Sequence, residues 1–135
     1  MMSRIYSGLI LGFAIVTSLA TSQKSHTRNF AEGTYLVTSD CPNAQAEGQL
    51  RIDPVVSGSG LDTENYTLVT GTDFGFPSNT LEHGAVKDPN QGDTATVTAN
   101  GRECKAMLWD TQAHSGLFTC HRGDQLECTI HLQKL

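Results

Sequence analysis

The four cysteines of the chain, Cys41, Cys104, Cys120 and Cys128, constrain its fold more than any other feature. They follow residues 1–20, which have the pattern of a secretory signal peptide: a basic residue near the start, a short apolar core and a small-residue cleavage site. An even set of cysteines in an exported chain of 135 residues predicts two disulfides, with three connectivities open. The sequence therefore predicts a secreted, extracellular domain that is held together covalently.

Composition and charge narrow the classes of partner. The net charge is −5, and the lysines and arginines form no cluster, so neither nucleic acid nor an anionic membrane is an expected partner. No cysteine spacing is C-x-x-C. The histidines, which form no H-x-H or H-x-x-x-H pair, are His26, His83, His114, His121 and His131. We therefore expect no metal site and no cofactor.

The rest of the chain carries strand signals and no helical periodicity longer than a turn or two. Residues 21–32 are polar and aperiodic, which predicts a flexible N-terminal arm before a single β domain over 33–135. Predicted strands cover 34–38, 49–52, 65–70, 81–86 and 94–99, with long loops at 57–60 and 87–93. The expected fold is an all-β sandwich or barrel of seven to eight mostly antiparallel strands.

Asn100-Gly101 is the clearest turn signal, because both residues tolerate the positive φ of a two-residue hairpin. A turn at this pair places Val97 opposite Cys104 and Ala95 opposite Ala106. These four residues then share one face of the hairpin.

The next two hairpins place the remaining cysteines of this sheet on one face but do not determine which of them bond. One register places Cys104 opposite Cys120, and a three-residue turn at Gly123–Gln125 places Cys120 opposite Cys128. Either neighbour can therefore bond Cys120. The remaining cysteine, Cys41, must fasten the N-terminal part of the domain to this sheet.

Four short segments at the C-terminal end have a familiar order and spacing; they are Thr94-Ala95-Thr96-Val97, Glu103-Cys104-Lys105-Ala106, Phe118-Thr119-Cys120 and Ile130-His131-Leu132. Together they resemble the end of the Alt a 1 family, small secreted fungal proteins that act as allergens and as elicitors of plant defence. The resemblance implies a disulfide-stapled β-barrel with a Cys104–Cys120 bridge, no catalytic centre, and binding to plant defence proteins or small phenolic ligands. That family has a second cysteine pair in mid-chain, whereas residues 42–103 contain none here. The resemblance then implies a replacement bridge from Cys41 to Cys128.

The expected function is that of a small secreted effector or elicitor, from a fungus or similar microbe, that binds a host extracellular protein or a small ligand without catalysis. Loops can vary in such a protein without disturbing the scaffold. The candidate recognition loops are Gly71–Ser78, Asp110–Ser115, which contains His114, and Arg122–Gln125.

Arg122-Gly123-Asp124 suggests a second function, adhesion through an integrin-type receptor. Such receptors read this tripeptide at a loop tip, where the guanidinium and the carboxylate project to opposite sides. Cysteines at 120 and 128 would hold the tip rigidly. The simpler interpretation is that Gly123-Asp124 is only a turn.

A third interpretation is a secreted ribonuclease, active or degenerate. Glu82, Arg102 and His114 are similar in order and spacing to the catalytic set of the guanine-specific fungal ribonucleases. The carboxylate would take the 2′-hydroxyl proton, the arginine would bind the phosphate, and the imidazolium would protonate the leaving oxygen.

Three further residues are candidates for a site. Asn65 opens an Asn-Tyr-Thr glycosylation sequon, which is usable in a secreted chain. Phe74 and Phe76 lie in a glycine-containing stretch, where they either cover a core or form an exposed platform for a ligand. The first of these roles is the one we expect.

Overall fold

The structure is a computed structural model that describes residues 28–57, 62–83 and 92–135. The predicted features that fall outside these residues are the signal peptide at 1–20, most of the arm at 21–32, and the larger parts of the loops at 57–60 and 87–93. Among the described residues, no helix is long and apolar enough to span a membrane.

The described residues form eleven strands. They are β1 (Asn29–Phe30), β2 (Gly33–Ser39), β3 (Glu47–Ile52), β4 (Val56–Ser57), β5 (Asp62–Thr70), β6 (Thr80–His83), β7 (Asp93–Ala99), β8 (Arg102–Leu108), β9 (Gln112–Ala113), β10 (Ser115–Arg122) and β11 (Gln125–Lys134).

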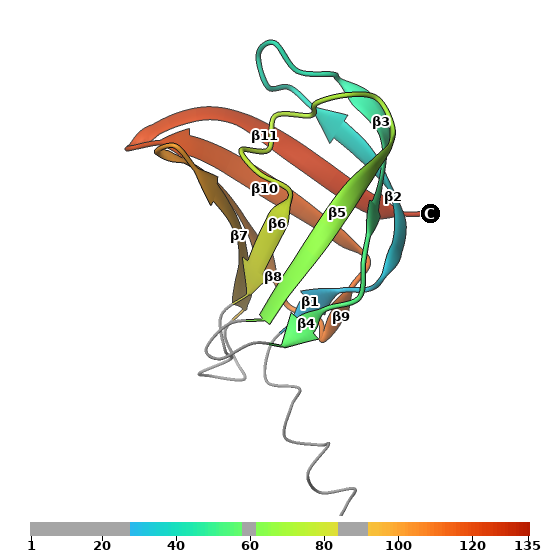
Figure 1. Cartoon of the computed structure of the whole chain (residues 1–135). Helices are drawn as coiled ribbons and strands as arrows, with labels where there is room; N and C mark the ends of the chain where they lie inside the picture. Colours follow the sequence, from blue (N-terminus) through green and yellow to red (C-terminus); the bar gives the residue numbers. More distant parts are fainter. Residues whose placement is uncertain (1–27, 58–61, 84–91) are drawn as a thin grey trace, which may run out of the picture.

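Eight of these strands close into an antiparallel barrel in the order β3-β2-β11-β10-β8-β7-β6-β5, and β5 returns to β3 (Figure 1). The all-β prediction is therefore confirmed, and the barrel is the form that it takes. Outside the closed ring, β4 pairs with the edge of β5, and β1 pairs in parallel with β9. Closure leaves the eight main strands without a free edge.

The core fills the inside of the barrel, because alternate residues of each strand point inward. Tyr35 and Val37 of β2, Leu50 and Ile52 of β3, and Phe118 of β10 are all 0% exposed. The large buried side chains belong to strands far apart in the sequence. The fold therefore depends on long-range pairing, which the two disulfides reinforce.

The predicted hairpin at Asn100-Gly101 is confirmed. Asn100 has φ 54° and Gly101 has φ 80°, as this kind of two-residue turn requires. Val97 lies opposite Cys104, and Ala95 lies opposite Ala106. The Asn100-Gly101 turn thus sets the register of the whole β7–β8 hairpin.

Both disulfides implied by the resemblance are present. Cys104 lies directly opposite Cys120 on the neighbouring strand and is bonded to it across 16 residues of sequence. Cys41 is bonded to Cys128 across 87 residues. The second bridge therefore ties the segment that follows β2 to β11.

The turn between β10 and β11 differs from the prediction of three residues at 123–125. Arg122 pairs with Gln125, so the turn contains only two residues, Gly123 and Asp124. The register shifts by one residue between His121 and Cys120, and Glu127 is the extra residue of the resulting β-bulge. Cys120 therefore still faces Cys128. The predicted cysteine register was right, although the predicted turn was wrong.

The predicted flexible arm is wrong for its last five residues, which we call the strap (residues 28–32). The N–H of Asn29 donates to the carbonyl of Thr111, and the N–H of Ala31 donates to the carbonyl of Ala113. Phe30 is only 2% exposed and stacks on the core. A buried aromatic side chain and backbone hydrogen bonds together therefore order a segment that is mostly polar.

Candidate functional site

Two polar clusters stand out, one at each end of the barrel. We call the first the stapled end: the β7–β8 turn, the β10–β11 turn, the loop at 71–78 and the Cys41–Cys128 disulfide. The tips of the two hairpins lie close together in Figure 1, because Arg102, which opens β8, pairs with Arg122, which ends β10. Predicted recognition loops 71–78 and 122–125 both belong to this end.

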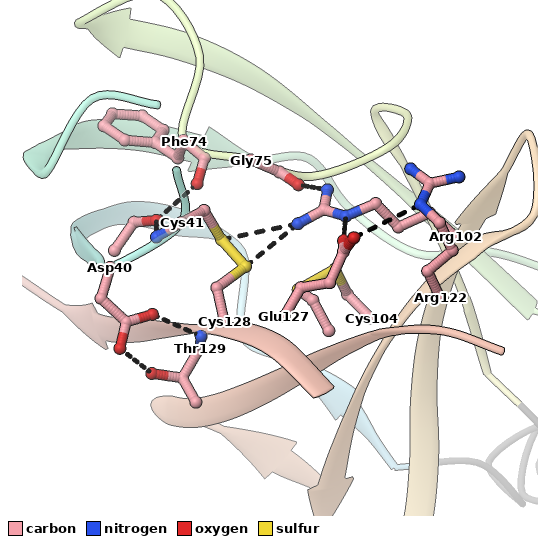
Figure 2. Close-up of a disulfide and its surroundings, with 12 residues drawn as sticks. Asp40, Cys41, Phe74, Gly75, Arg102, Cys104, Arg122, Glu127, Cys128 and Thr129 are labelled. Atoms are coloured by element: carbon pink, nitrogen blue, oxygen red, sulfur yellow. Dashed lines mark hydrogen bonds and ion pairs between the residues drawn. A yellow bond between two sulfur atoms is a disulfide. The ribbon is translucent and has the colours of Figure 1, made fainter. Parts of the chain in front are cut away.

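Arg102 is the centre of the stapled end (Figure 2). Its Nε donates to Glu127 Oε1 at 2.7 Å, and its Nη1 donates to the carbonyl of Gly75 in the loop. Its Nη2 lies 3.0 Å from Cys128 Sγ and 3.6 Å from Cys41 Sγ. One guanidinium thus joins a hairpin, a loop and a disulfide, and its fork of donors suits that task.

Glu127 accepts hydrogen bonds from both arginines of the cluster. Arg122 Nε donates to its Oε2 at 3.3 Å, and Arg122 Nη1 donates to the carbonyl of Asn100 at 3.2 Å. The hydrogen bond from Arg102, followed by the one from Arg122, lowers the pKa of the Glu127 carboxyl below its ordinary value of 4.5. Glu127 is therefore ionised at neutral pH and holds the two hairpins together.

A second set of hydrogen bonds lies on the other side of the disulfide. The Thr129 N–H donates to Asp40 Oδ1 at 2.6 Å, and the Thr129 hydroxyl lies 3.3 Å from Asp40 Oδ2. The Asp40 N–H donates to the Thr129 carbonyl at 3.1 Å. The residues next to Cys41 and Cys128 are therefore joined by hydrogen bonds as well as by the bridge.

Two grooves flank Arg102. The first, of about 320 Å³, is lined by Pro42, Asn43, Ala44, Asp73, Gly75, Phe76, Arg102, Arg122 and Glu127. The second, of about 500 Å³, is more open and is lined by Thr98, Ala99, Asn100, Gly101, Arg102, Glu103, His121 and Gly123. Both grooves offer charged donors and acceptors on backbone that hairpins and disulfides hold in place.

The Arg122-Gly123-Asp124 tripeptide lies at the turn between β10 and β11. Arg122 belongs to β10, and its guanidinium folds back onto Glu127 and the carbonyl of Asn100. Its side chain thus lies along the barrel surface, while Gly123 and Asp124 form the turn. Adhesion through the tripeptide stays a prediction.

The three ribonuclease-like residues do not meet. Arg102 pairs with the last residue of β10, whereas His114 directly precedes its first residue. Eight strand residues separate these positions by roughly 25 Å at ~3.3 Å per residue. Glu82 is exposed on β6, a strand separated from β8 by β7. No common site can include all three.

The two phenylalanines are part of the core. Phe74 is 2% exposed and Phe76 is 9% exposed, and Phe76 packs edge-on against Phe118. Neither forms an exposed platform, so the expected covering role is the one observed. Gly48 permits it, since a Cβ there would lie 2.6 Å from the Phe74 ring.

The sequon residue Asn65 is exposed on β5, and its amide oxygen accepts a hydrogen bond from the Thr80 hydroxyl at 2.9 Å. Its side chain is thus on the outer surface of the barrel. The use of the sequon stays a prediction.

The second polar cluster is buried at the other end of the barrel, under the strap. His83 Nε2 lies 2.7 Å from Glu64 Oε1, and these side chains are 0% and 1% exposed. The same Glu64 oxygen accepts the N–H of Phe30 at 2.9 Å. The histidine contact is close but poorly aligned, since neither ring nitrogen of His83 makes a well-formed hydrogen bond within the described part of the chain.

Tyr35 borders this buried pair. Its hydroxyl lies 2.5 Å from the carbonyl of Ala31 and 3.0 Å from that of Ala113. Burial, and then the nearby Glu64, raise the pKa of Tyr35 above its ordinary value of 10.0. The tyrosine therefore remains a neutral donor that binds the strap to the barrel.

Sequence reasoning missed Glu127, Glu64 and His83. One signal was available for the first: the register that sets Cys104 opposite Cys120 also sets Arg102 opposite Arg122. Two facing arginines repel each other unless a carboxylate lies between them. No comparable signal pointed to the buried pair.

Among the described residues, the one group of side chains close enough to share a metal ion is Cys41, Cys120 and Cys128, and all three are in disulfides. The comparisons with known proteins add no assignment: no family model, no curated protein and no solved structure matches the chain.

Proposed function

We propose that the protein is a small secreted binding protein of the effector or elicitor type, which recognises a host extracellular protein through its stapled end. The observation that carries the proposal is a groove in which the 71–78 loop and the segment after Cys41 meet Arg102 and Arg122, the arginines next to the two turns. Arg102 and the Cys41–Cys128 bridge hold these segments in place. A surface ordered in advance loses little conformational entropy when it binds, which favours recognition.

The groove chemistry indicates what a partner would present. Arg122 is 56% exposed at its side chain and lines the groove beside Glu127. Asp73, on the facing loop, accepts the N–H of Gly75 at 2.8 Å. A polar protein loop with its own carboxylate and amide groups fits such a surface better than an apolar ligand does. The two disulfides suit an oxidising extracellular setting.

The test is a capture experiment with immobilised, disulfide-intact protein and plant apoplastic fluid, followed by mass spectrometry and direct binding measurements on each recovered protein. We expect Arg122→Ala to weaken binding of a true partner by at least about tenfold, as loss of a charged interface contact does. Arg51→Ala is the matched control, because Arg51 is a half-exposed surface arginine of β3 that pairs with Glu32 in the strap.

The outcomes separate cleanly. Selective loss of binding in the Arg122 variant supports recognition at the stapled end. Equal binding by both variants and the unmodified protein excludes this end as the contact surface. If no protein is recovered specifically from the fluid, the effector proposal fails.

A further inference from the structure

We propose that the Cys41–Cys128 disulfide is a thiol–disulfide exchange site, at which Cys41 forms a mixed disulfide with a small extracellular thiol of the cysteine or glutathione class. The bridge lies beside the groove of about 320 Å³. Pro42, which follows Cys41, and Glu127, which precedes Cys128, both line that groove. The groove therefore reaches the residue next to each cysteine, and Cys41 and Cys128 themselves are 7% and 4% exposed.

Arg102 makes the two sulfurs of the bridge unequal. Its Nη2 is 3.0 Å from Cys128 Sγ but 3.6 Å from Cys41 Sγ. Exchange is faster when the departing sulfur is stabilised as a thiolate, and an adjacent guanidinium stabilises it. Attack at Cys41, with Cys128 as the leaving sulfur, is therefore the favoured direction.

The charge of Arg102 is available for this role. Its side chain is only 14% exposed, so solvent screens it weakly. Glu127 neutralises part of the charge, but Glu127 is shared with Arg122, so two guanidinium groups face one carboxylate. A thiolate on Cys128 would complete the balance of charge.

The sulfur chemistry needs no external oxidant. The incoming thiolate bonds to Cys41 Sγ as the Cys41–Cys128 bond breaks, and the electron pair goes to Cys128 Sγ. Cys128 can then attack the Cys41 sulfur again and expel the external thiolate, which restores the bridge. It can also attack Cys120, because the sulfurs of Cys41, Cys120 and Cys128 lie within 4.8 Å of one another. That attack breaks the Cys104–Cys120 bond and leaves Cys104 as the thiolate.

The surrounding structure keeps the opened bridge ready to close. Ile130 pairs with Ser39 in the β2–β11 ladder, immediately beside the disulfide. Asp40 and Thr129 add backbone and side-chain hydrogen bonds on the same side. Opening the bridge therefore leaves Cys41 and Cys128 close together, and exchange is reversible within a folded barrel.

The first test exposes the folded protein to a mixture of reduced and oxidised glutathione, traps thiols by alkylation, and maps the peptides by mass spectrometry over time. We expect a glutathione adduct on Cys41 before any on Cys104 or Cys120. Arg102→Gln should slow its formation about fivefold, because the departing thiolate loses its cation. Arg51→Gln is the control, because Arg51 is a surface arginine of β3 that pairs with Glu32 and does not line the groove. First modification at Cys104 or Cys120, or equal rates in the two arginine variants, overturns the proposal.

Replacing Arg102 has two effects: it removes the charge beside Cys128, and it removes the contact with Gly75 and so uncovers the bridge. An exchange rate alone does not distinguish these effects. The second test therefore compares Cys41→Ser with Cys41→Ser/Arg102→Gln and follows alkylation of Cys128 against pH. The midpoint should lie about one pH unit lower when Arg102 is present, and Arg102→Lys should preserve most of that shift. Equal midpoints in the two proteins would refute the role of Arg102. Both tests use glutathione or an alkylating reagent, so their result is independent of the proposed host partner.

Discussion

The two ends of the barrel are closed by opposite means. The stapled end uses a disulfide and a partly exposed ion cluster centred on Arg102. The strap end uses a buried aromatic ring, Phe30, above a Glu64–His83 pair that water does not reach. Exposed ion pairs contribute little to stability but can fix the shape of a surface, whereas removing one partner of a buried polar pair is costly. The comparison indicates that the stapled end is suited to recognition and exchange, and the strap end to holding the barrel closed.

The largest expected effect tests the covalent side of this comparison. Cys41→Ser/Cys128→Ser should lower the free energy of unfolding by roughly 4–5 kcal/mol, since the bridge closes a long loop of the unfolded chain. Cys104→Ser/Cys120→Ser should cost roughly 3 kcal/mol, because its loop is short. Urea unfolding of the three proteins measures both changes. A greater loss in the Cys104/Cys120 variant would contradict the loop-length argument.

The next effect tests the buried side. Glu64→Ala leaves the His83 ring and the Phe30 N–H without their partner in a dry interior, so we expect a loss of about 3–4 kcal/mol. Replacing both residues, as in Glu64→Leu/His83→Phe, should recover most of that stability, because apolar groups of similar volume need no partner. Chemical denaturation and hydrogen exchange of the strap amides measure the effect.

Two outcomes would change this view of the strap end. If Glu64→Ala is as stable as the unmodified protein, the pair does not hold the strap. If the double variant is no better than the single one, the cost comes from lost packing and not from an unpaired polar group. Glu82→Ala, at an exposed carboxylate of β6, is the control and should change stability little.

The same comparison shows where sequence reasoning succeeded. Local turn chemistry at Asn100-Gly101 predicted the β7–β8 register. Because side chains alternate between the two faces of a strand, the same reasoning predicted that the three C-terminal cysteines share one face. Both rules depend on neighbouring strands only. Closure of the barrel also depends on the long-range pairing of β2 with β11, and no short pattern specified it.

The missed features share a physical cause. Phe30 anchors the strap, and its ring fits because Gly116 has no side chain: a Cβ there would lie 2.7 Å from the ring. Glu64 and His83 are polar residues at inward positions, which alternation alone assigns to apolar side chains. Glu127 reaches both arginines from a bulge, and bulges have no reliable sequence signal. Each feature is a departure from a regular pattern.

The smallest effect concerns pH at the stapled end. The pKa of Glu127 is lower in the folded protein than its ordinary value of 4.5, because Arg102 and then Arg122 donate to the carboxylate. Its contribution to stability is thus complete above the unfolded-state pKa and is lost as the pH falls through the lower folded-state pKa. We expect Glu127→Gln to lower the melting temperature slightly at neutral pH, and the difference from the unmodified protein to vanish once the folded-state carboxyl is protonated.

Melting curves of both proteins between about pH 2.5 and pH 7 measure this convergence, provided that salt is kept constant, because screening weakens exposed ion pairs. Glu82→Gln serves as the control and should differ from the unmodified protein by the same small amount throughout. A Glu127→Gln difference that is independent of pH would mean that the bulge acts through its backbone shape. In that case the two arginines would be positioned by the hairpin turns, and the distinction between an electrostatic end and a packed end of the barrel would weaken.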